Sequence, residues 1–262
     1  MNIIVCIKQV PDTKEISIDS RTGTLIREGV PSIINPDDKN AIEAALSIRD
    51  TVDKNAHICV ISMGPNQAEI VLLEALAMGC DEAYLICDRV FAGSDTYATS
   101  TILSKAISHI GSFDLILCGK QAIDGDTAQV GPQLAEKLDL PQLTSVRSIE
   151  IESQRTTVHS VNENGYREIT SDIPVLITCV KELNVPRYTR VSGIYKAFNQ
   201  GIKILSNAEL QLSMKEIGLE GSPTSVLKTF TPDKHHNSEM LEGTNLEKVT
   251  QLISNLYENH II

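Results

Sequence analysis

The residues best suited to chemistry lie between Cys118 and Gly131, in a segment that combines glycines with acidic and hydroxyl side chains. Its notable residues are three evenly spaced glycines, two acids and a threonine: Gly119, Gly125, Gly131, Asp124, Asp126 and Thr127. The apolar run 113–117 before it predicts a buried strand, and 132–138 after it predicts a helix. A loop between a strand and a helix presents free backbone N–H groups and the positive end of the helix dipole. This arrangement predicts a phosphate site, and a nucleotide is the expected ligand.

The spacing in this segment differs from two common phosphate motifs. The pair Gly119-Lys120 does not belong to a P-loop, because Gln121 stands where that motif has a hydroxyl residue. The chain has no G-x-G-x-x-G fingerprint either. The helix that follows the segment is expected to take its N-cap from Asp126 or Thr127.

Polar residues also follow the first apolar run and precede the first helical pattern. Lys8 and Gln9 stand near the end of the run 2–10, where a cation and an amide could meet phosphate or adenine. Asn35 and Asp37 precede the helical pattern and could cap it. Capping or turn formation explains each of these residues adequately on its own.

Strand and helix signals alternate along the first half of the chain. Apolar runs predict strands over 2–10, 57–61, 82–87 and 113–117, and helical spacing predicts helices over 40–52, 67–78 and 95–110. Ser94 or Asp95 is placed to cap the last of these helices. Repeated units of this kind predict an α/β fold with a doubly wound, mainly parallel sheet. In such sheets, ligands bind beyond the carboxyl ends of the strands, where the strand order reverses.

After Pro141 the pattern changes. Strands are expected over 146–152, 156–162 and 173–180, with a turn over 162–165. From about residue 202, scattered glycines and prolines replace the regular strand and helix patterns. This change predicts a domain over 1–205 and an extended C-terminal arm over 206–262. A final helix over 245–259 carries an apolar stripe formed by Leu246, Val249, Leu252, Ile253 and Leu256. This stripe is expected to pack either on the chain's own domain or on a partner.

The composition argues against several classes of function. A net charge of −11 disfavours nucleic acid as a partner, because duplex binding needs a dense footprint of Lys and Arg. No apolar run is long enough to span a bilayer, and the first residues lack the basic start of a signal peptide. The six cysteines form no C-x-x-C pair. We therefore expect a cytoplasmic protein without disulfides, membrane insertion or a metal site, and His235-His236 is interpreted as part of a solvated loop.

Several short segments, taken together and in this order, resemble the beta subunit of electron-transfer flavoproteins. They are Cys6–Val10, Asn35–Pro36, Met63–Pro65, Ala75–Gly79, Gly119–Asp124, Pro186–Tyr188 and Gly193–Ala197. The resemblance implies an adenine-nucleotide alpha-hydrolase-like fold and an alpha subunit that holds its own FAD. The C-terminal arm over 206–262 is expected to contact that alpha subunit. Beta subunits of this family bind one of two ligands. Ordinary members bind AMP as a structural ligand, whereas bifurcating members bind a second FAD that takes a hydride from NADH.

Three segments resemble the bifurcating group: 91–96, 124–132 and 222–232. This resemblance implies FAD rather than AMP, and Gly125 and Ala128 leave room for the backbone to approach it closely. In that group one electron goes to ferredoxin or flavodoxin. The other passes through the alpha-subunit FAD to a flavin-dependent dehydrogenase of the acyl-CoA or lactate type.

Two alternatives stay open beside this interpretation. In the first, the chain is a non-bifurcating subunit that holds AMP. In the second, it is a nucleotide-binding regulator of the universal-stress type that works without an alpha subunit, and its tail helix forms homodimers. The family resemblance and the long tail both weigh against the second alternative.

The resemblance implies a cofactor site built at several strand exits and no catalytic acid–base residue. The predicted cofactor-binding residues are Cys6, Ile7, Lys8, Gln9, Asn35, Asp38, Met63, Gly64, Ser94, Asp95, Thr96, Gly119, Lys120, Gln121, Asp124, Gly125, Asp126, Thr127, Ala128, Gln129, Val130 and Gly131. The pyrophosphate is expected along 125–131. The loop 186–193 resembles the family's recognition loop for dehydrogenases, although a structural turn would also explain it. Its predicted partner contacts are Pro186, Arg187, Tyr188 and Arg190.

Overall fold

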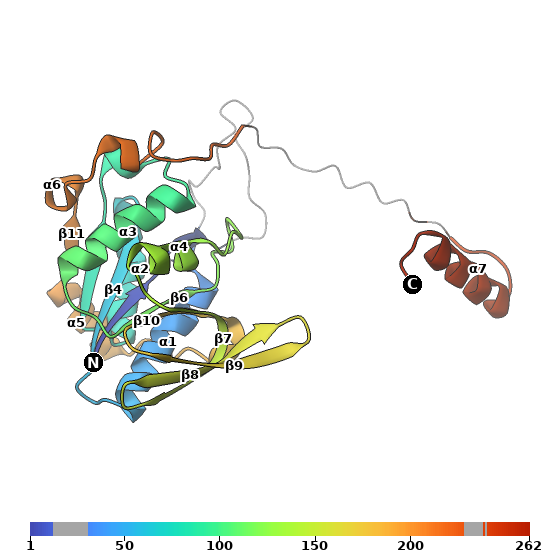
Figure 1. The fold of residues 1–262 in the computed structure, drawn as a ribbon, viewed down its shortest axis with the longest axis horizontal. Coiled ribbons are helices and arrows are strands. Elements are labelled where there is room, and N and C mark those ends of the chain that lie inside the picture. The colour runs from blue at the N-terminus through green and yellow to red at the C-terminus, as the bar shows by residue number, and fades with distance from the viewer. Residues whose placement is uncertain (13–30, 228–237, 239) are drawn as a thin grey trace.

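The computed structural model describes residues 1–12, 31–227, 238 and 240–262, and its centre is a nine-stranded sheet in the order β11-β5-β4-β1-β6-β10-β7-β8-β9 (Figure 1). Seven strands run parallel: β1 (Asn2–Cys6), β4 (His57–Met63), β5 (Glu82–Ile86), β6 (Leu115–Gly119), β7 (Gln142–Glu152), β10 (Val175–Cys179) and β11 (Lys203–Leu205). An antiparallel meander follows β7 (Gln142–Glu152) through β8 (Arg155–Asn162) to β9 (Gly165–Asp172). The short strands β2 (Gln9–Pro11) and β3 (Ser32–Ile34) pair separately.

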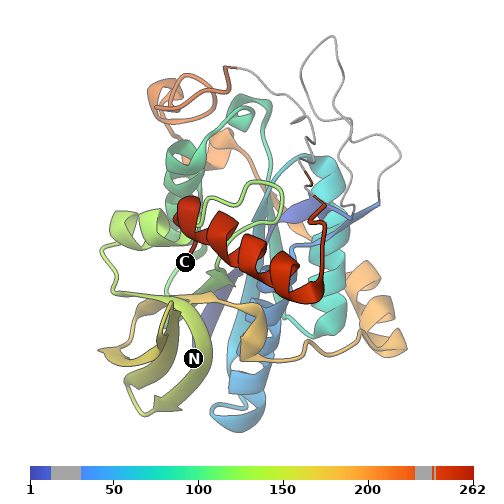
Figure 2. The ribbon, with the colours of Figure 1, turned by 90° about the vertical axis from the view of Figure 1, so that its right-hand side faces the viewer.

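Helices cover both faces of the sheet, as Figure 2 shows. Those on one face are α1 (Pro36–Thr51), α2 (Glu69–Met78) and α5 (Val191–Gln200), and those on the other are α3 (Thr96–Ile110), α4 (Val130–Lys137) and the short α6 (Asn207–Leu210). Single 3₁₀ turns occur at Asn66–Ala68, Arg89–Phe91, Lys181–Leu183 and Met214–Glu216. The last helix, α7 (Asn245–Glu258), stands apart from this body (Figure 1).

The parallel strands are apolar on both faces because a layer of helices covers each face. Along β1, Ile3 and Val5 pack with the α1 and α2 layer, whereas Ile4 and Cys6 pack with the α3 layer. Every residue of β6 and of β10 is buried. The expected doubly wound, mainly parallel sheet is therefore confirmed.

The strand order reverses beside β1. From β1 the chain moves to β4 and β5 on one side, and it then returns to place β6 on the other side. The crevice at the carboxyl ends of β1 and β6 is therefore the switch point at which such folds bind ligands.

The prediction of one strand over 2–10 is wrong. β1 ends at Cys6. The Ile7 N–H still donates to the Ile61 carbonyl of β4 at 2.9 Å, but the Lys8 N–H donates to the Asp38 carboxylate at 2.8 Å. The chain then leaves the sheet and forms β2 against β3. The apolar run could not show this break, because the group that causes it lies 30 residues away in sequence.

Several elements were not predicted. The strand β9 is almost wholly exposed and has no alternation of apolar residues, so neither periodicity marks it. The helix α5 follows the expected recognition loop, and β11 adds a parallel edge strand to β5. Packing also continues past residue 205, since Leu210 and Ile217 are buried in the core beneath α3. The division into domain and arm near residue 205 remains a prediction.

The helix α7 is amphipathic and begins with a capping box in which Thr244 and Glu247 bond each other's backbone N–H groups. None of its residues is buried within the part of the chain that the structure describes. No described helix is both long enough and apolar enough to cross a membrane.

Candidate nucleotide site

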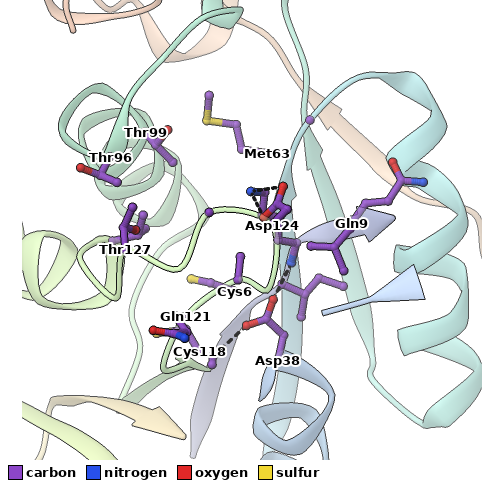
Figure 3. A pocket seen from close by; sticks show the side chains of 18 of the residues that line it. Cys6, Gln9, Asp38, Met63, Thr96, Thr99, Cys118, Gln121, Asp124 and Thr127 are labelled. Carbon is purple, nitrogen blue, oxygen red and sulfur yellow. Dashed lines mark hydrogen bonds and ion pairs between the residues drawn. The ribbon is translucent and has the colours of Figure 1, made fainter. Parts of the chain in front are cut away.

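A cavity of about 500 Å³ opens at the carboxyl ends of β1, β4 and β6 (Figure 3). The last residues of these strands, Cys6, Met63 and Gly119, all contribute to its wall. Of the predicted cofactor-binding residues, all line this cavity except Asn35 and Asp126. Residues far apart in the sequence thus converge at the switch point, although their role in binding a cofactor stays a prediction.

Asn35 lies behind the cavity wall and holds it in place. Its side chain is fully buried, its Nδ2 donates to the Gln121 carbonyl at 2.9 Å, and its Oδ1 accepts from the Ile123 N–H at 3.0 Å. It makes no side-chain capping bond to α1. Asn35 therefore attaches the loop after β6 to the start of α1, and capping does not explain it.

Asp38 joins the ends of the two central strands. One carboxylate oxygen accepts from the Lys8 N–H and the other from the Gly119 N–H, both at 2.8 Å (Figure 3). Burial raises the pKa of Asp38 to about 7, and the hydrogen bonds from these two backbone groups limit the rise. The floor of the cavity thus contains one carboxyl group that titrates near neutral pH.

Lys8 and Asp124 close one side of the cavity. The Lys8 Nζ lies 2.7 Å from the Asp124 carboxylate, which is almost fully buried, while the lysine side chain is half-exposed. Lys8, which was expected to meet a phosphate, is therefore paired with Asp124 of the loop after β6. A ligand phosphate placed here would meet a neutral ion pair and not a free ammonium group.

Two helix N-termini border the cavity side by side. Asp95 caps α3 by accepting from the Ala98 N–H at 3.0 Å, which confirms the expected cap. The start of α4 contributes Val130 to the cavity wall. The Thr96 hydroxyl donates to Gln129 Oε1 at 2.9 Å and ties the two helix starts together.

The expected cap of α4 is wrong. The N-cap residue is Gln129, which makes no side-chain capping bond, and Asp126 accepts instead from Gln121 Nε2 at 2.9 Å. Asp126 and Ala128 adopt left-handed φ values of 47° and 52°, so the chain turns twice before the helix can begin. The first N–H groups of α4 are thus left without a side-chain partner beside the cavity, as an anion site requires.

The space available for a side chain differs among Gly119, Gly125 and Gly131. A Cβ on Gly131 would lie 2.6 Å from Thr178 Cγ2, and a Cβ on Gly119 would lie 2.7 Å from the Asp37 Cβ. Nothing lies within 4 Å of a Cβ built on Gly125. Packing therefore fixes Gly119 and Gly131, whereas Gly125 faces open space in the cavity.

Several cavity residues were not predicted, among them Phe91, Thr99, Leu103 and Cys118. Thr99 follows Thr96 by three residues on α3, so helical spacing alone would have placed it on the same face. Cys118 lies beside Cys6 in the register of β1 and β6. Both thiols are buried, and burial raises the pKa of each. They are therefore inert apolar parts of the floor.

The start of the C-terminal arm is tied to the cavity rim. The Thr224 N–H and hydroxyl donate to Asp95 Oδ2 at 3.0 and 2.8 Å, and the Asp95 N–H donates to the Ser222 hydroxyl at 2.8 Å. Two of the segments that resemble the bifurcating group, 91–96 and the start of 222–232, therefore lie against each other. The rest of the predicted tail motif from 228 to 232, and His235-His236, lie outside the described residues.

The predicted recognition loop presents some of its residues and uses others internally. Tyr188 is 96% exposed, and Arg190 is also exposed at the start of α5. Arg187, in contrast, donates through Nε to Glu43 at 2.8 Å and through Nη2 to Asp50 at 2.9 Å. Its guanidinium is therefore occupied within the chain. The partner contacts at Pro186, Tyr188 and Arg190 stay predictions.

Comparison with known proteins shows the family to which the chain belongs. The model of the electron transfer flavoprotein domain matches residues 22–210. The chain is 56% identical to the electron transfer flavoprotein subunit beta of Thermoanaerobacterium thermosaccharolyticum over the whole of both chains. It is 51% identical to the caffeyl-CoA reductase-Etf complex subunit CarD of Acetobacterium woodii, again over the whole of both chains. It is 44% identical to the acryloyl-CoA reductase electron transfer subunit gamma of Anaerotignum propionicum, with full coverage of both chains. The chain therefore belongs to the electron transfer flavoprotein family, as a beta subunit.

Proposed function

We propose that this beta subunit binds FAD in the cavity at the switch point and that NADH is the electron donor. The observation that carries the proposal is the N-terminus of α4, which has no side-chain cap and lies at Val130 in the cavity wall, beside the start of α3. The N-terminus of α3 already holds the Asp95 carboxylate, whereas that of α4 favours an anionic ligand group. A pyrophosphate offers this N-terminus more charge than the single phosphate of AMP does.

The side chains around the cavity fit the other parts of such a ligand. Ile7 and Met63 offer apolar surface for an adenine ring, and Thr99 and Thr127 add hydroxyl groups beside the helix starts. The open space at Gly125 allows a phosphate to approach the backbone. When bound, the flavin supplies hydride and single-electron chemistry, while this chain supplies binding, orientation and electrostatics.

Bifurcation follows from this proposal when the chain is paired with an alpha subunit that holds its own FAD. One electron of each pair then goes to ferredoxin or flavodoxin, and the other goes through the alpha-subunit flavin to a flavin-dependent dehydrogenase. Two relatives are named as parts of caffeyl-CoA and acryloyl-CoA reductase complexes, which supports an acyl-CoA-type partner over a lactate-type one. The exposed residues near Tyr188 form the proposed docking surface for that partner.

Counting the bound ligands tests the proposal. The chain is purified with its alpha subunit, the ligands are released by denaturation, and FAD and AMP are quantified for each heterodimer. Two FAD and no AMP are expected. One FAD with one AMP would assign the cavity to a structural nucleotide and would overturn the proposal, and failure to form a heterodimer would point to a stand-alone nucleotide-binding protein.

A further inference from the structure

The proposed docking surface is apolar and strongly exposed. Val185, Tyr188 and Val191 are exposed by 90%, 96% and 85%, and the neighbouring Tyr195 and Phe198 on α5 are also exposed. Large apolar side chains gathered in this way mark a contact surface. Such a surface binds its partner well only if it is held in one conformation beforehand, because ordering it during binding costs affinity.

One face of α1 holds the segment that leads into this surface. Asn40 Nδ2 donates to the Asn184 carbonyl at 2.7 Å, and Asn184 Nδ2 donates back to the Asn40 carbonyl at 3.0 Å. Three residues further along α1, Glu43 accepts from the backbone N–H of Arg187 at 3.0 Å. The spacing of Asn40, Glu43 and Asp50 places all three on the same side of the helix.

Glu43 binds the side chain of Arg187 as well as its backbone. Its carboxylate also accepts from Arg187 Nε and Nη2, both at 2.8 Å, and from the Ser47 hydroxyl at 3.1 Å. Burial alone raises the pKa of Glu43, but the hydrogen bonds and the charge of Arg187 outweigh it and hold the pKa below its ordinary value. Glu43 therefore stays ionised near neutral pH and fixes both the backbone and the side chain of Arg187.

The far end of the surface is held by close packing. A Cβ on Gly193, in the first turn of α5, would collide with the Ala77 carbonyl oxygen of α2. Residues 185–191 thus lie between an attachment to α1 and an attachment to α2, while Val185, Tyr188 and Val191 stay exposed. The N-terminal end of α1 also carries Asp38, which lies in the cavity floor.

We propose that Glu43 is a positioning residue for docking: with Asn40 and Asp50 it holds residues 184–188 in the conformation that presents Val185 and Tyr188 to the dehydrogenase. This inference rests on the proposed role of that surface. Glu43 itself does not line the cavity.

The test uses Glu43→Gln in the complete heterodimer, with a flavin-dependent acyl-CoA dehydrogenase that the wild-type heterodimer reduces. We expect the KM for the dehydrogenase to rise about fivefold with kcat unchanged, since a loosened loop must be ordered again at each encounter. Amide hydrogen exchange over residues 184–188 should become faster. Glu74→Gln is the matched control, because it removes the half-buried Lys39–Glu74 ion pair, also between α1 and its neighbour, without touching the loop.

Tyr188→Ala separates this inference from the proposed docking surface. If Tyr188→Ala leaves the KM for the dehydrogenase unchanged, the dehydrogenase does not dock at this surface, and the proposed role of Glu43 is refuted as well. If Tyr188→Ala raises the KM but Glu43→Gln does not, the surface stands and the positioning role is overturned. A loss of bound FAD or of kcat in Glu43→Gln would show a general structural role and would also overturn it.

Discussion

Asp38 connects the two central strands at the point where the cofactor is proposed to bind. Its carboxylate replaces a sheet partner for the Lys8 and Gly119 N–H groups, so the strands separate there and the crevice opens. Burial of a carboxyl group costs stability when the group is ionised. The raised pKa of Asp38 is the measurable sign of that cost.

The sign of the resulting pH dependence follows from linkage. Burial raises the pKa of Asp38 from 3.8 to about 7, so between these values the folded chain holds a proton that the unfolded chain has released. The contribution of Asp38 to the free energy of unfolding is therefore largest below the lower value and is lost as the pH rises through the upper one. We expect the difference in free energy of unfolding between wild type and Asp38→Asn to be larger at about pH 5 than at about pH 8. Urea denaturation at both values measures it, and an equal difference would refute the assignment.

Gly131 provides a second residue-level test. A Cβ there would press on Thr178 and Cys118 beneath α4, so Gly131→Ala should lower the free energy of unfolding by about 1–3 kcal/mol. Gly125→Ala is the control, because its Cβ would meet open space and should change stability by less than about 0.5 kcal/mol. Equal effects of the two substitutions would contradict the packing of α4 against the sheet.

The elements around the cavity are tied together by the arm. Thr224 bonds the same Asp95 that caps α3, so the arm and the rim of the cavity share one carboxylate. Thr224→Val removes the hydroxyl bond and should cost about 0.5–1.5 kcal/mol, with faster hydrogen exchange over 222–227. Thr101→Val serves as its control, since that hydroxyl donates only to the Tyr97 carbonyl on the exposed side of α3. Unchanged exchange at 222–227 would mean that the arm is not held at Asp95.

Periodicity and capping predicted those elements whose stabilising contacts are apolar or local. The buried strands β4, β5 and β6 and the cap of α3 by Asp95 belong to this group. The early end of β1 depends on Asp38, and α5 depends on contacts with α2, so both needed residues distant in sequence. Most of the predicted site residues line one cavity because parallel strands end at one edge of the sheet, and their role in binding stays a prediction. The sequence could not show that the side chains of Asn35 and Asp126 bond residues of the loop after β6, or that Arg187 pairs with Glu43. Those bonds depend on side-chain directions that only the fold determines.

For the molecule as a whole, the apolar stripe of α7, which none of the described residues buries, is the feature that best fits contact with a second chain. Leu246, Val249, Leu252 and Ile253 are exposed on one side of a helix that stands apart from the body. We propose that the arm, through this helix, contacts the alpha subunit. A helix of this kind is unstable alone unless its apolar face is covered.

Leu252→Asp should therefore weaken the heterodimer by a factor of about 30, since an apolar anchor is replaced by a charge. Gln251→Asp adds the same charge on the opposite side of α7 and should leave the affinity within about twofold. Sedimentation velocity over a range of concentrations measures both. Equal affinities would show that the alpha subunit does not cover this stripe.

The central claim is that a second flavin occupies the cavity of this chain, and Gly125→Val tests it most directly. The valine side chain meets open space in the protein and projects where the pyrophosphate is proposed to lie, so folding should be preserved while the ligand is excluded. We predict that the flavin content of the heterodimer falls from two to one, with the alpha-subunit FAD retained and reduction by NADH lost. Retention of both flavins in the variant would contradict the account.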